Sequence, residues 1–213
     1  MATVTDYPKT ECDFLALIAS PDGAYDEGLR FFKGAGMIND AVKRITGDLE
    51  ARGIDYTLIG AGALNRHGYQ RFTSDIDMVL SVEGLERFHA ELIGRGYRPA
   101  FPGAKKAFRW TEGNVPIEVI TTDEFPGDGL PKAVRFPDPA TEYVVIDGVR
   151  TVPLPRLVEL KLASGMTGRG RLKDLADVQE LIRILELPAA FGEQLDASVR
   201  AKFAELYNDL HGE

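Results

Sequence analysis

Residues 75–80 combine two regularly spaced acids with apolar side chains, and this feature constrains the fold most. Asp75 and Asp77 flank Ile76, and Met78 follows. Because successive side chains of a β-strand point to opposite faces, both carboxylates leave one face while Ile76 and Met78 enter the core. Two residues along a strand span only about 6.6 Å, so the two charges need a cation or an exposed position. The pattern predicts a half-buried strand that presents a pair of acids.

The segments around this strand predict a sheet that follows one helix and precedes several others. Residues 38–53 have the apolar spacing of a helix, and 84–95 have it again. Further strands are expected at 56–59, 106–110, 115–120, 143–146 and 149–152. The turn at 60–62 precedes a short helix at 63–67, and 125–140 is a loop rich in Pro, Gly and Asp. Helices are expected at 155–164, 172–187 and 189–210.

This order of elements predicts an α/β fold of the α+β type. We expect a mixed β-sheet of about four to six short strands flanked by helices, with a C-terminal helical region. Residues 1–36 show no sustained periodicity and are interpreted as an accessory arm. Residues 37–153 form the α/β core, and residues 154–213 form helices packed on it. Pro116 places its strand at a sheet edge or at a strand beginning.

Composition excludes several other classes of protein. The 213 residues include 44% hydrophobic and 27% charged side chains, which is typical of a globular protein. The single cysteine, Cys12, excludes an internal disulfide, and no apolar run approaches the roughly 20 residues that cross a bilayer. We expect a cytoplasmic protein with no membrane partner. The net charge of -8 disfavours a broad nucleic-acid footprint, although a local basic groove is compatible with it.

A third acid, Glu118, lies within an otherwise apolar strand. An unpaired charge is costly to bury, so Glu118 is expected to have a partner. A carboxylate on a strand beside Asp75 and Asp77 would complete a site for two metal ions, and hard oxygen ligands suit Mg²⁺. The alternative for Asp75 and Asp77 is a solvent-exposed strand face.

Several short motifs together resemble a known family. They are Leu58-Ile59-Gly60-Ala61, Asn65-Arg66-His67-Gly68-Tyr69, Arg71, Thr73 and Asp75-Ile76-Asp77. This combination resembles the signature of the DNA polymerase β-like nucleotidyltransferase superfamily, and within it the AbiEii-like and minimal nucleotidyltransferase groups. The runs at 160–163 and 171–178 resemble the helical motif that those groups place after the sheet. The likeness spans about residues 56–187.

The resemblance implies an enzyme that moves a nucleoside monophosphate from a nucleoside triphosphate to a hydroxyl, with release of pyrophosphate. Asp75, Asp77 and Glu118 would be the catalytic residues and the ligands of two Mg²⁺ ions, with Mn²⁺ as an alternative. The nucleotide-binding residues would be Gly60, Ala61, Ser74, Lys161, Arg171, Lys173 and Asp174. The family's acceptors are small molecules, proteins or RNA. It also includes toxins of toxin–antitoxin pairs, for which an antitoxin protein would be a partner.

Two positions depart from the usual family pattern. Ala61 stands where Gly or Ser is usual, and Glu118 stands where Asp is common. Small side chains at Gly60 and Ala61 would still expose backbone N–H groups to phosphate oxygens.

Other residues have two interpretations each. Lys161 is either a snorkelling lysine on an apolar helix or a phosphate ligand. The glycine- and arginine-rich residues 165–171 would close on a polyanion or form a helix C-cap and linker, and the C-cap is favoured for Gly165. Asp174 would favour the start of a helix, and Asp177 would pair with a cation.

Aromatic and basic residues also lie together at 105–110. Trp110 with Lys105, Lys106 and Arg109 would suit a nucleic-acid strip, but we expect Trp110 and Phe108 to share a buried face while the cations stay solvated.

Two other functions compete with nucleotidyl transfer. Gly60-Ala61-Gly62 after a strand resembles the start of a dinucleotide-binding fingerprint, but Asn65 occupies the third glycine position. A dinucleotide-binding oxidoreductase is therefore a remote alternative. The other is a catalytically silent nucleotide-binding or interaction module of the same fold, which the presence of all three acids disfavours.

Overall fold

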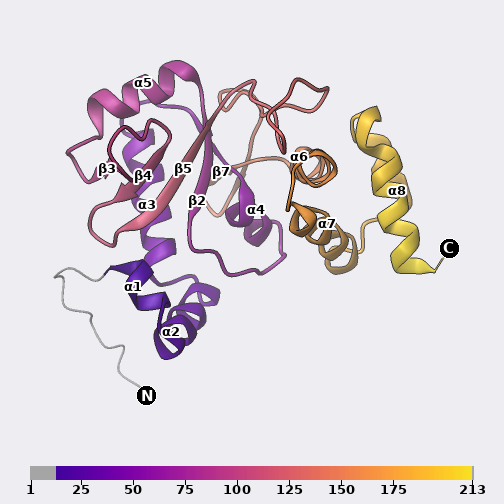
Figure 1. Cartoon of the computed structure of the whole chain (residues 1–213), viewed down its shortest axis with the longest axis horizontal. Helices are drawn as coiled ribbons and strands as arrows, with labels where there is room; N and C mark the ends of the chain where they lie inside the picture. The colour runs from indigo at the N-terminus through magenta and orange to yellow at the C-terminus, as the bar shows by residue number, and fades with distance from the viewer. Residues whose placement is uncertain (1–12, 213) are drawn as a thin grey trace.

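The computed structural model describes residues 13–212 (Figure 1). Its sheet has seven strands in the order β3-β4-β5-β2-β1-β7-β6. The strands are β1 (Tyr56–Leu58), β2 (Ile76–Leu80), β3 (Tyr97–Pro99), β4 (Ala107–Trp110), β5 (Val115–Thr121), β6 (Val144–Ile146) and β7 (Val149–Thr151). The helices are α1 (Phe14–Ile18), α2 (Pro21–Phe32), α3 (Met37–Glu50), α4 (Gly60–Arg66), α5 (Val82–Glu91), α6 (Leu154–Thr167), α7 (Leu172–Ile184) and α8 (Ala197–His211), with a 3₁₀ helix, η1, at Ala189–Gln194.

The sheet is mixed, which confirms the predicted fold class. β2 pairs with β5 in parallel and with β1 in antiparallel orientation, while β1 pairs with β7 in parallel. The hairpin predicted around Asp147-Gly148 is present as β6 and β7. The sheet therefore brings β1, β2 and β5, which are far apart in sequence, side by side at its centre.

Helices cover both faces of the sheet (Figure 1). One hydrophobic core joins α3 and α5 to the face that carries Ile76, Met78 and Ile117. The other core joins α4, α6, α7 and α8 to the face that carries Val79 and Ile59. The alternation predicted for β2 is therefore confirmed for Ile76 and Met78, which are both buried.

The predicted arm contains two helices, α1 and α2, that the sequence pattern did not indicate. Residues 1–12, including Cys12, lie outside the described part of the chain. Phe14 and Phe31 are buried in the same core as α3, so these helices are fastened to the sheet. Buried Glu27 of α2 accepts the backbone N–H of Met37 at 2.5 Å, where α3 begins without a cap from its own sequence. The sequence did not predict these two helices because each buries only one aromatic ring in this core, which gives no sustained helical pattern of apolar residues.

Four further expectations need correction. The sheet has seven strands rather than four to six, because β3 contains Arg98 and Pro99 and lacks a strand-like apolar pattern. α4 begins at Gly60, so the expected turn is the first turn of that helix. The predicted helix at 189–210 is divided into η1 and α8, since Asp196 caps α8 by accepting the N–H of Ser198. Gly165 lies inside α6, where an added Cβ would lie 2.5 Å from Cγ of Leu175, so it permits close packing of α7 rather than ending the helix.

Two remaining expectations concern single residues. Pro116 is the second residue of β5, which is a central strand, so it marks a strand beginning and not an edge. Phe108 is buried and Trp110 packs against the same core, as expected.

Within residues 13–212, no helix combines the length and the apolar character that a membrane span requires.

Candidate active site

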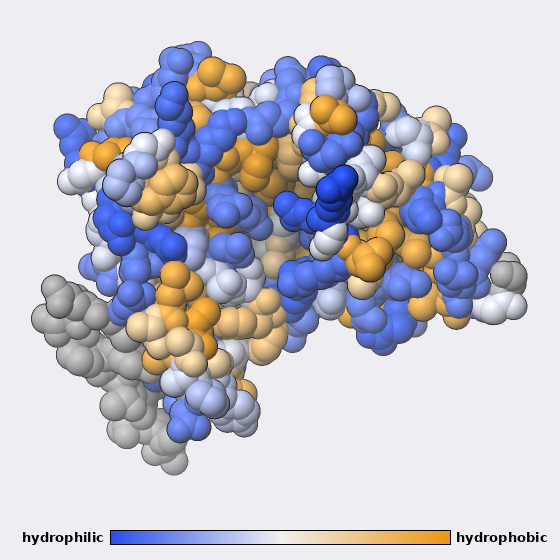
Figure 2. All heavy atoms as spheres, in the orientation of Figure 1, coloured by the Kyte–Doolittle hydropathy of each residue, from blue (hydrophilic) through white to orange (hydrophobic). Residues whose placement is uncertain are grey.

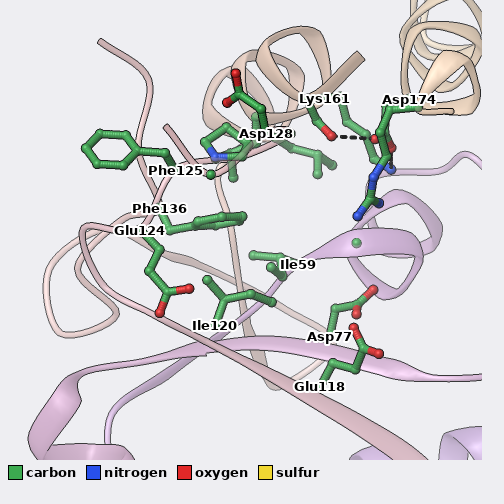
Figure 3. Close-up of a pocket in the computed structure, with 18 residues that line it drawn as sticks. Ile59, Asp77, Glu118, Ile120, Glu124, Phe125, Asp128, Phe136, Lys161 and Asp174 are labelled. Carbon is green, nitrogen blue, oxygen red and sulfur yellow. Dashed lines mark hydrogen bonds and ion pairs between the residues drawn. The ribbon is translucent and has the colours of Figure 1, made fainter. Parts of the chain in front are cut away.

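The three predicted acids lie near the centre of the sheet, where Asp77 and Glu118 are neighbours. Asp77 on β2 and Glu118 on β5 are register partners in adjacent parallel strands, which are about 4.8 Å apart. Their side chains lie next to each other in Figure 3. Asp75 precedes β2, and its Oδ1 accepts a 2.6 Å hydrogen bond from Oγ1 of Thr73. Parallel pairing of β2 with β5 thus places a carboxylate pair on one face, with Asp75 two residues away.

Glu118 is exposed, contrary to the expectation of a buried charge that needs a partner. β5 alternates buried and open positions, and Glu118 occupies the most open of them. Its apolar neighbours in sequence point mostly into the opposite core, so the strand does not bury the carboxylate. Within the described chain, no hydrogen bond or ion pair engages it. Glu118 is free to receive a ligand or a proton.

Gly60 lies directly against Asp77. An added Cβ at Gly60 would lie 2.0 Å from Oδ2 of Asp77, and Gly60 has a φ of +60°. Only glycine combines this backbone conformation with such a close approach at low cost. The first turn of α4 has no side-chain cap, so its leading backbone N–H groups are available next to the acids.

The charge of Asp77 is poorly compensated. Burial, with the like charges of Asp75 and Glu118 nearby, raises the pKa of Asp77 to about 7, against the opposing effect of Lys161 and Arg171. A nearby cation would stabilise the ionised form of such a carboxylate, because it would replace the hydration that burial removes. It is the most strongly perturbed carboxyl group whose pKa is resolved in this cleft, which is typical of functional sites.

The donor set suits a hard divalent cation. Asp75, Asp77 and Glu118 offer carboxylate oxygens, and Asp77 and Glu118 have no cationic partner within ion-pair distance among residues 13–212. In the described chain, no three His, Cys, Asp or Glu side chains already stand in a metal-holding arrangement. The fit therefore rests on the chemistry and uncompensated charge of the donors, and binding would draw the carboxylates together.

A cavity of about 550 Å³ opens on one side of the acids, and its lining is highly charged, with four basic residues and four acids. Its basic lining residues are Arg71, Lys161, Arg171 and Lys173. Gly60, Ala61, Ser74 and Asp174 also line it, so this cavity gathers all seven predicted nucleotide-binding residues. Hydroxyl and guanidinium donors around a shared hollow are suited to phosphate oxygens.

A second cavity of about 430 Å³ adjoins the first, and its lining combines apolar with charged residues. Its apolar lining residues are Ile59, Ile120, Phe125, Phe136, Leu157 and Leu160. Figure 3 shows Ile59 and Ile120 between Phe136 and the pair of Asp77 and Glu118, with the Lys161–Asp174 pair above those two acids. In Figure 2 this face is hollowed between the sheet and helices α6 and α7, with apolar side chains in its upper part. The two cavities form one cleft, because they share Gly60, Asp77, Glu118, Lys161, Arg171 and Asp174. The first alone has Arg71 and Lys173, and the second alone has Phe125 and Phe136.

An ion-pair network holds α6 and α7 to the segment before β2. Nζ of Lys161 lies 2.6 Å from Oδ1 of Asp174 and 2.8 Å from Oδ2 of Asp177. Arg71 donates to both carboxylate oxygens of Asp177 at 2.7 and 2.6 Å. Burial opposes the charge of Asp174, but Lys161 and the hydroxyl of Ser164 hold the pKa of Asp174 below its ordinary value. Lys161 is therefore neither a snorkelling lysine nor a free cation, and the predicted pairing of Asp177 is confirmed.

Several lining residues were not predicted. Thr73, which the sequence offered only as part of the family motif, donates a hydrogen bond to Asp75, and Ile18 brings the N-terminal helices to the first cavity. Phe125 and Phe136 come from the long loop at 125–140, whose sequence indicated only turns. The aromatic residues of that loop were the available signal, because exposed loops seldom need two phenylalanines.

We predict that the thermal stability of the metal-free protein decreases as the pH rises from about 4 to about 7 through the titration of Asp77. The folded-state pKa of Asp77 lies above its unfolded value, so the folded state binds more protons in this window and loses that advantage as the pH increases. Millimolar Mg²⁺ should therefore raise the Tm more at about pH 8 than at about pH 5.5, because only the ionised carboxyl is a metal ligand. Differential scanning fluorimetry at matched ionic strength measures this. An equal Mg²⁺ shift at both pH values would contradict the prediction.

Comparisons with known proteins bear on the fold. No protein-family model matches the sequence, and no curated protein gives a significant match. Among solved structures, the antibiotic-resistance factor ANT(2'')-Ia, determined in solution, is 16% identical, with 81% of this chain and 96% of that chain covered and a TM-score of 0.50. An antigenic nucleotidyltransferase-like protein from Paracoccidioides brasiliensis is also 16% identical, with 81% and 89% covered and a TM-score of 0.50. These likenesses show that the chain has a nucleotidyltransferase-like fold.

Proposed function

We propose that this protein transfers a nucleoside monophosphate from a nucleoside triphosphate to a hydroxyl of an acceptor, with magnesium as the metal. The observation that carries the proposal is the register of Asp77 with Glu118 on parallel strands, beside Asp75 and in a cleft that has Arg71 and Lys173 at one end and Phe125 and Phe136 at the other. The nucleotidyltransferase-like fold supports this reaction class. The AbiEii-like subgroup, a toxin role and an antitoxin partner remain predictions from the sequence.

The two ends of the cleft suit the two ends of a nucleoside triphosphate. Arg171 and Lys173, with backbone N–H groups at the start of α4, would bind the triphosphate tail. The second cavity, with Phe125 and Phe136, would hold the base and sugar, since its volume and its aromatic lining suit a flat ring. The α-phosphate then lies over Asp75 and Asp77.

The three acids would have different roles in the reaction. Asp75 and Asp77 would hold the metal, which when bound supplies positive charge that stabilises the transferring phosphate. Exposed Glu118 would accept the proton of the acceptor hydroxyl. The hydroxyl oxygen forms a bond to the α-phosphorus, the bond from that phosphorus to the bridging oxygen breaks, and pyrophosphate leaves with the electron pair. Arg171 and Lys173 would offset the charge that collects on the leaving group.

Incubation of the purified protein with Mg²⁺ and each α-labelled nucleoside triphosphate tests the proposal. Label should pass to the protein itself or to a component of a cell extract, and pyrophosphate should be released in equal amount. Binding of the triphosphate without transfer to any acceptor would favour the catalytically silent module. Failure to bind any triphosphate in the presence of Mg²⁺ would reject the proposed function.

A further inference from the structure

The outer face of α2 carries a row of exposed apolar side chains. Leu29 follows Tyr25 by four residues and precedes Phe32 by three, so the three side chains lie on one side of the helix. Their exposed fractions are 68% for Tyr25, 44% for Leu29 and 45% for Phe32. The residues that α2 buries lie on the opposite side, and they are Gly23, Glu27 and Phe31. Packing within the chain therefore accounts for one face of α2 and leaves this apolar row open to solvent.

The surroundings of the row agree with an open contact surface. Single exposed apolar residues are ordinary on protein surfaces, but adjoining ones on one helix face are typical of a contact with another molecule. An added Cβ on Gly28, which lies beside the row, would meet no atom within 4 Å. Figure 1 shows α2 in the lower left corner, at the opposite end of the molecule from α8. The row is therefore available to a second molecule.

Charged residues border the row along one side. Asp22 and Asp26 lie in the first half of α2, and Lys33 is its C-cap residue. Their spacing of four and seven residues places all three on one line along the helix. The three side chains are exposed, and none of them makes a hydrogen bond or an ion pair with another residue of the described chain. The border is therefore acidic at one end and basic at the other.

These charges favour an antiparallel pairing of two such helices. Around a two-fold axis, an antiparallel pair brings the same border of both helices together, with the first half of one beside the second half of the other. When Tyr25 is level with Phe32 of a second copy, Lys33 is level with the gap between Asp22 and Asp26 of that copy. A parallel pair would set each aspartate beside its own equivalent, which is unfavourable. We propose that α2 forms the interface of a homodimer, in which the apolar rows pack in antiparallel orientation and Lys33 pairs with Asp22 and Asp26 of the other copy.

The proposed interface lies behind one wall of the cleft. The rings of Phe31 and Phe72 are in edge-to-face contact with their centroids 5.3 Å apart, and Phe72 lines the first cavity together with Ile18. The apolar row itself lines neither cavity. Variants in the row therefore test the interface without removing a residue from the cleft, and the inference does not rest on the proposed nucleotidyl transfer.

Sedimentation equilibrium of the full chain, from about 5 to about 500 µM, tests the inference. The apolar row is short, so we expect a weak dimer with a dissociation constant of about 10–100 µM. Leu29→Glu should weaken the dimer at least about tenfold, because it removes apolar contact and places two like charges near the two-fold axis. Leu210→Glu on α8 is the matched control, since Leu210 is 39% exposed on another helix and its replacement should leave the dimer intact.

Exchange of the border charges tests the orientation of the two helices. Lys33→Glu makes the border wholly acidic, and the double variant Asp22→Lys with Asp26→Lys makes it wholly basic. Each protein alone should dimerise at least about tenfold more weakly than the unaltered chain, because like charges then face each other. A mixture of the two should form a heterodimer at least as tight as the unaltered homodimer, since every border contact becomes attractive. Sedimentation velocity with a fluorescent label on one variant measures this, and thermal denaturation checks that each variant is folded.

The outcomes decide the inference separately from the proposed function. A concentration-dependent dimer that Leu29→Glu disrupts and that the mixture of charge variants restores supports it, whether or not the protein transfers nucleotides. A protein that stays monomeric throughout overturns it and leaves the row to another segment of the chain or to a different protein. A dimer that persists in folded Leu29→Glu protein also overturns it, since the interface then lies elsewhere. Failure of the mixture to associate rejects the antiparallel pairing.

Discussion

The variant Asp77→Asn is expected to lose nucleotidyl transfer by about 10³-fold and yet to unfold at a higher temperature than the unaltered protein without metal. Transfer is lost because a neutral amide is a poor ligand for magnesium, so the variant should not hold the metal ion that binds the triphosphate. Stability rises because asparagine carries no charge, whereas Asp77 is ionised at neutral pH only against burial and two like charges. We expect a gain of about 1–2 kcal/mol, which corresponds to roughly 2–8 °C in Tm.

Steady-state transfer rates and thermal denaturation in the presence of a chelator measure the two effects. Asp26→Asn on α2 is the matched control, because Asp26 is exposed and lies outside both cavities. That control should change neither quantity by more than about 0.5 kcal/mol. A stable Asp77→Asn protein that keeps its transfer activity would remove Asp77 from the site. A variant with lower stability would show that the carboxylate is compensated in the folded protein.

The second large effect is expected at Gly60. Gly60→Ala should destabilise the protein by about 1–3 kcal/mol and reduce transfer by about 10²-fold or more. The added methyl group would need the space of Oδ2 of Asp77, at 2.0 Å, and alanine disfavours the φ of +60°. The carboxylate must then turn away from Glu118, so metal-dependent nucleotide binding should weaken together with stability.

Gly47→Ala is the matched control for this substitution. Gly47 lies within α3, and an added Cβ meets no atom within 4 Å, so the same change should stabilise the protein by roughly 0.5–1 kcal/mol. Urea denaturation gives both free energies, and titration with a fluorescent nucleotide analogue in the presence of Mg²⁺ gives the affinities. Normal nucleotide affinity in a folded Gly60→Ala protein would show that the contact between Gly60 and Asp77 is unimportant for the site.

The central strands were predictable because their sequence pattern and their burial agree. β2 shows acids and apolar residues in alternation, and the β6–β7 hairpin has a turn sequence of the type that hairpins require. β3 could not be predicted, since Arg98 and Pro99 give a strand that is recognisable only through its pairing with β4. Likewise, α1 and α2 owe their position to Phe14, Phe31 and the cap from Glu27, which are contacts between distant segments.

The candidate site was predictable in its residues but not in its electrostatics. The acids and the glycine turn could be found from spacing and family resemblance. Glu118 was expected to be buried because its neighbours in sequence are apolar, whereas strand alternation leaves it open. Pairing of Lys161 with Asp174 and Asp177 depends on the packing angle of α6 and α7, which no local pattern specifies.

The ion-pair network also determines when the cleft can assemble while the chain is being synthesised. The acids of β2 and β5 leave the ribosome well before Asp174 and Asp177, which hold Lys161 and Arg71 in place. Until α7 has been made, Lys161 and Arg71 do not yet have their carboxylate partners, and the cleft lacks the lining residues that α7 contributes. A nascent chain therefore cannot assemble this cleft before α7 has left the ribosome.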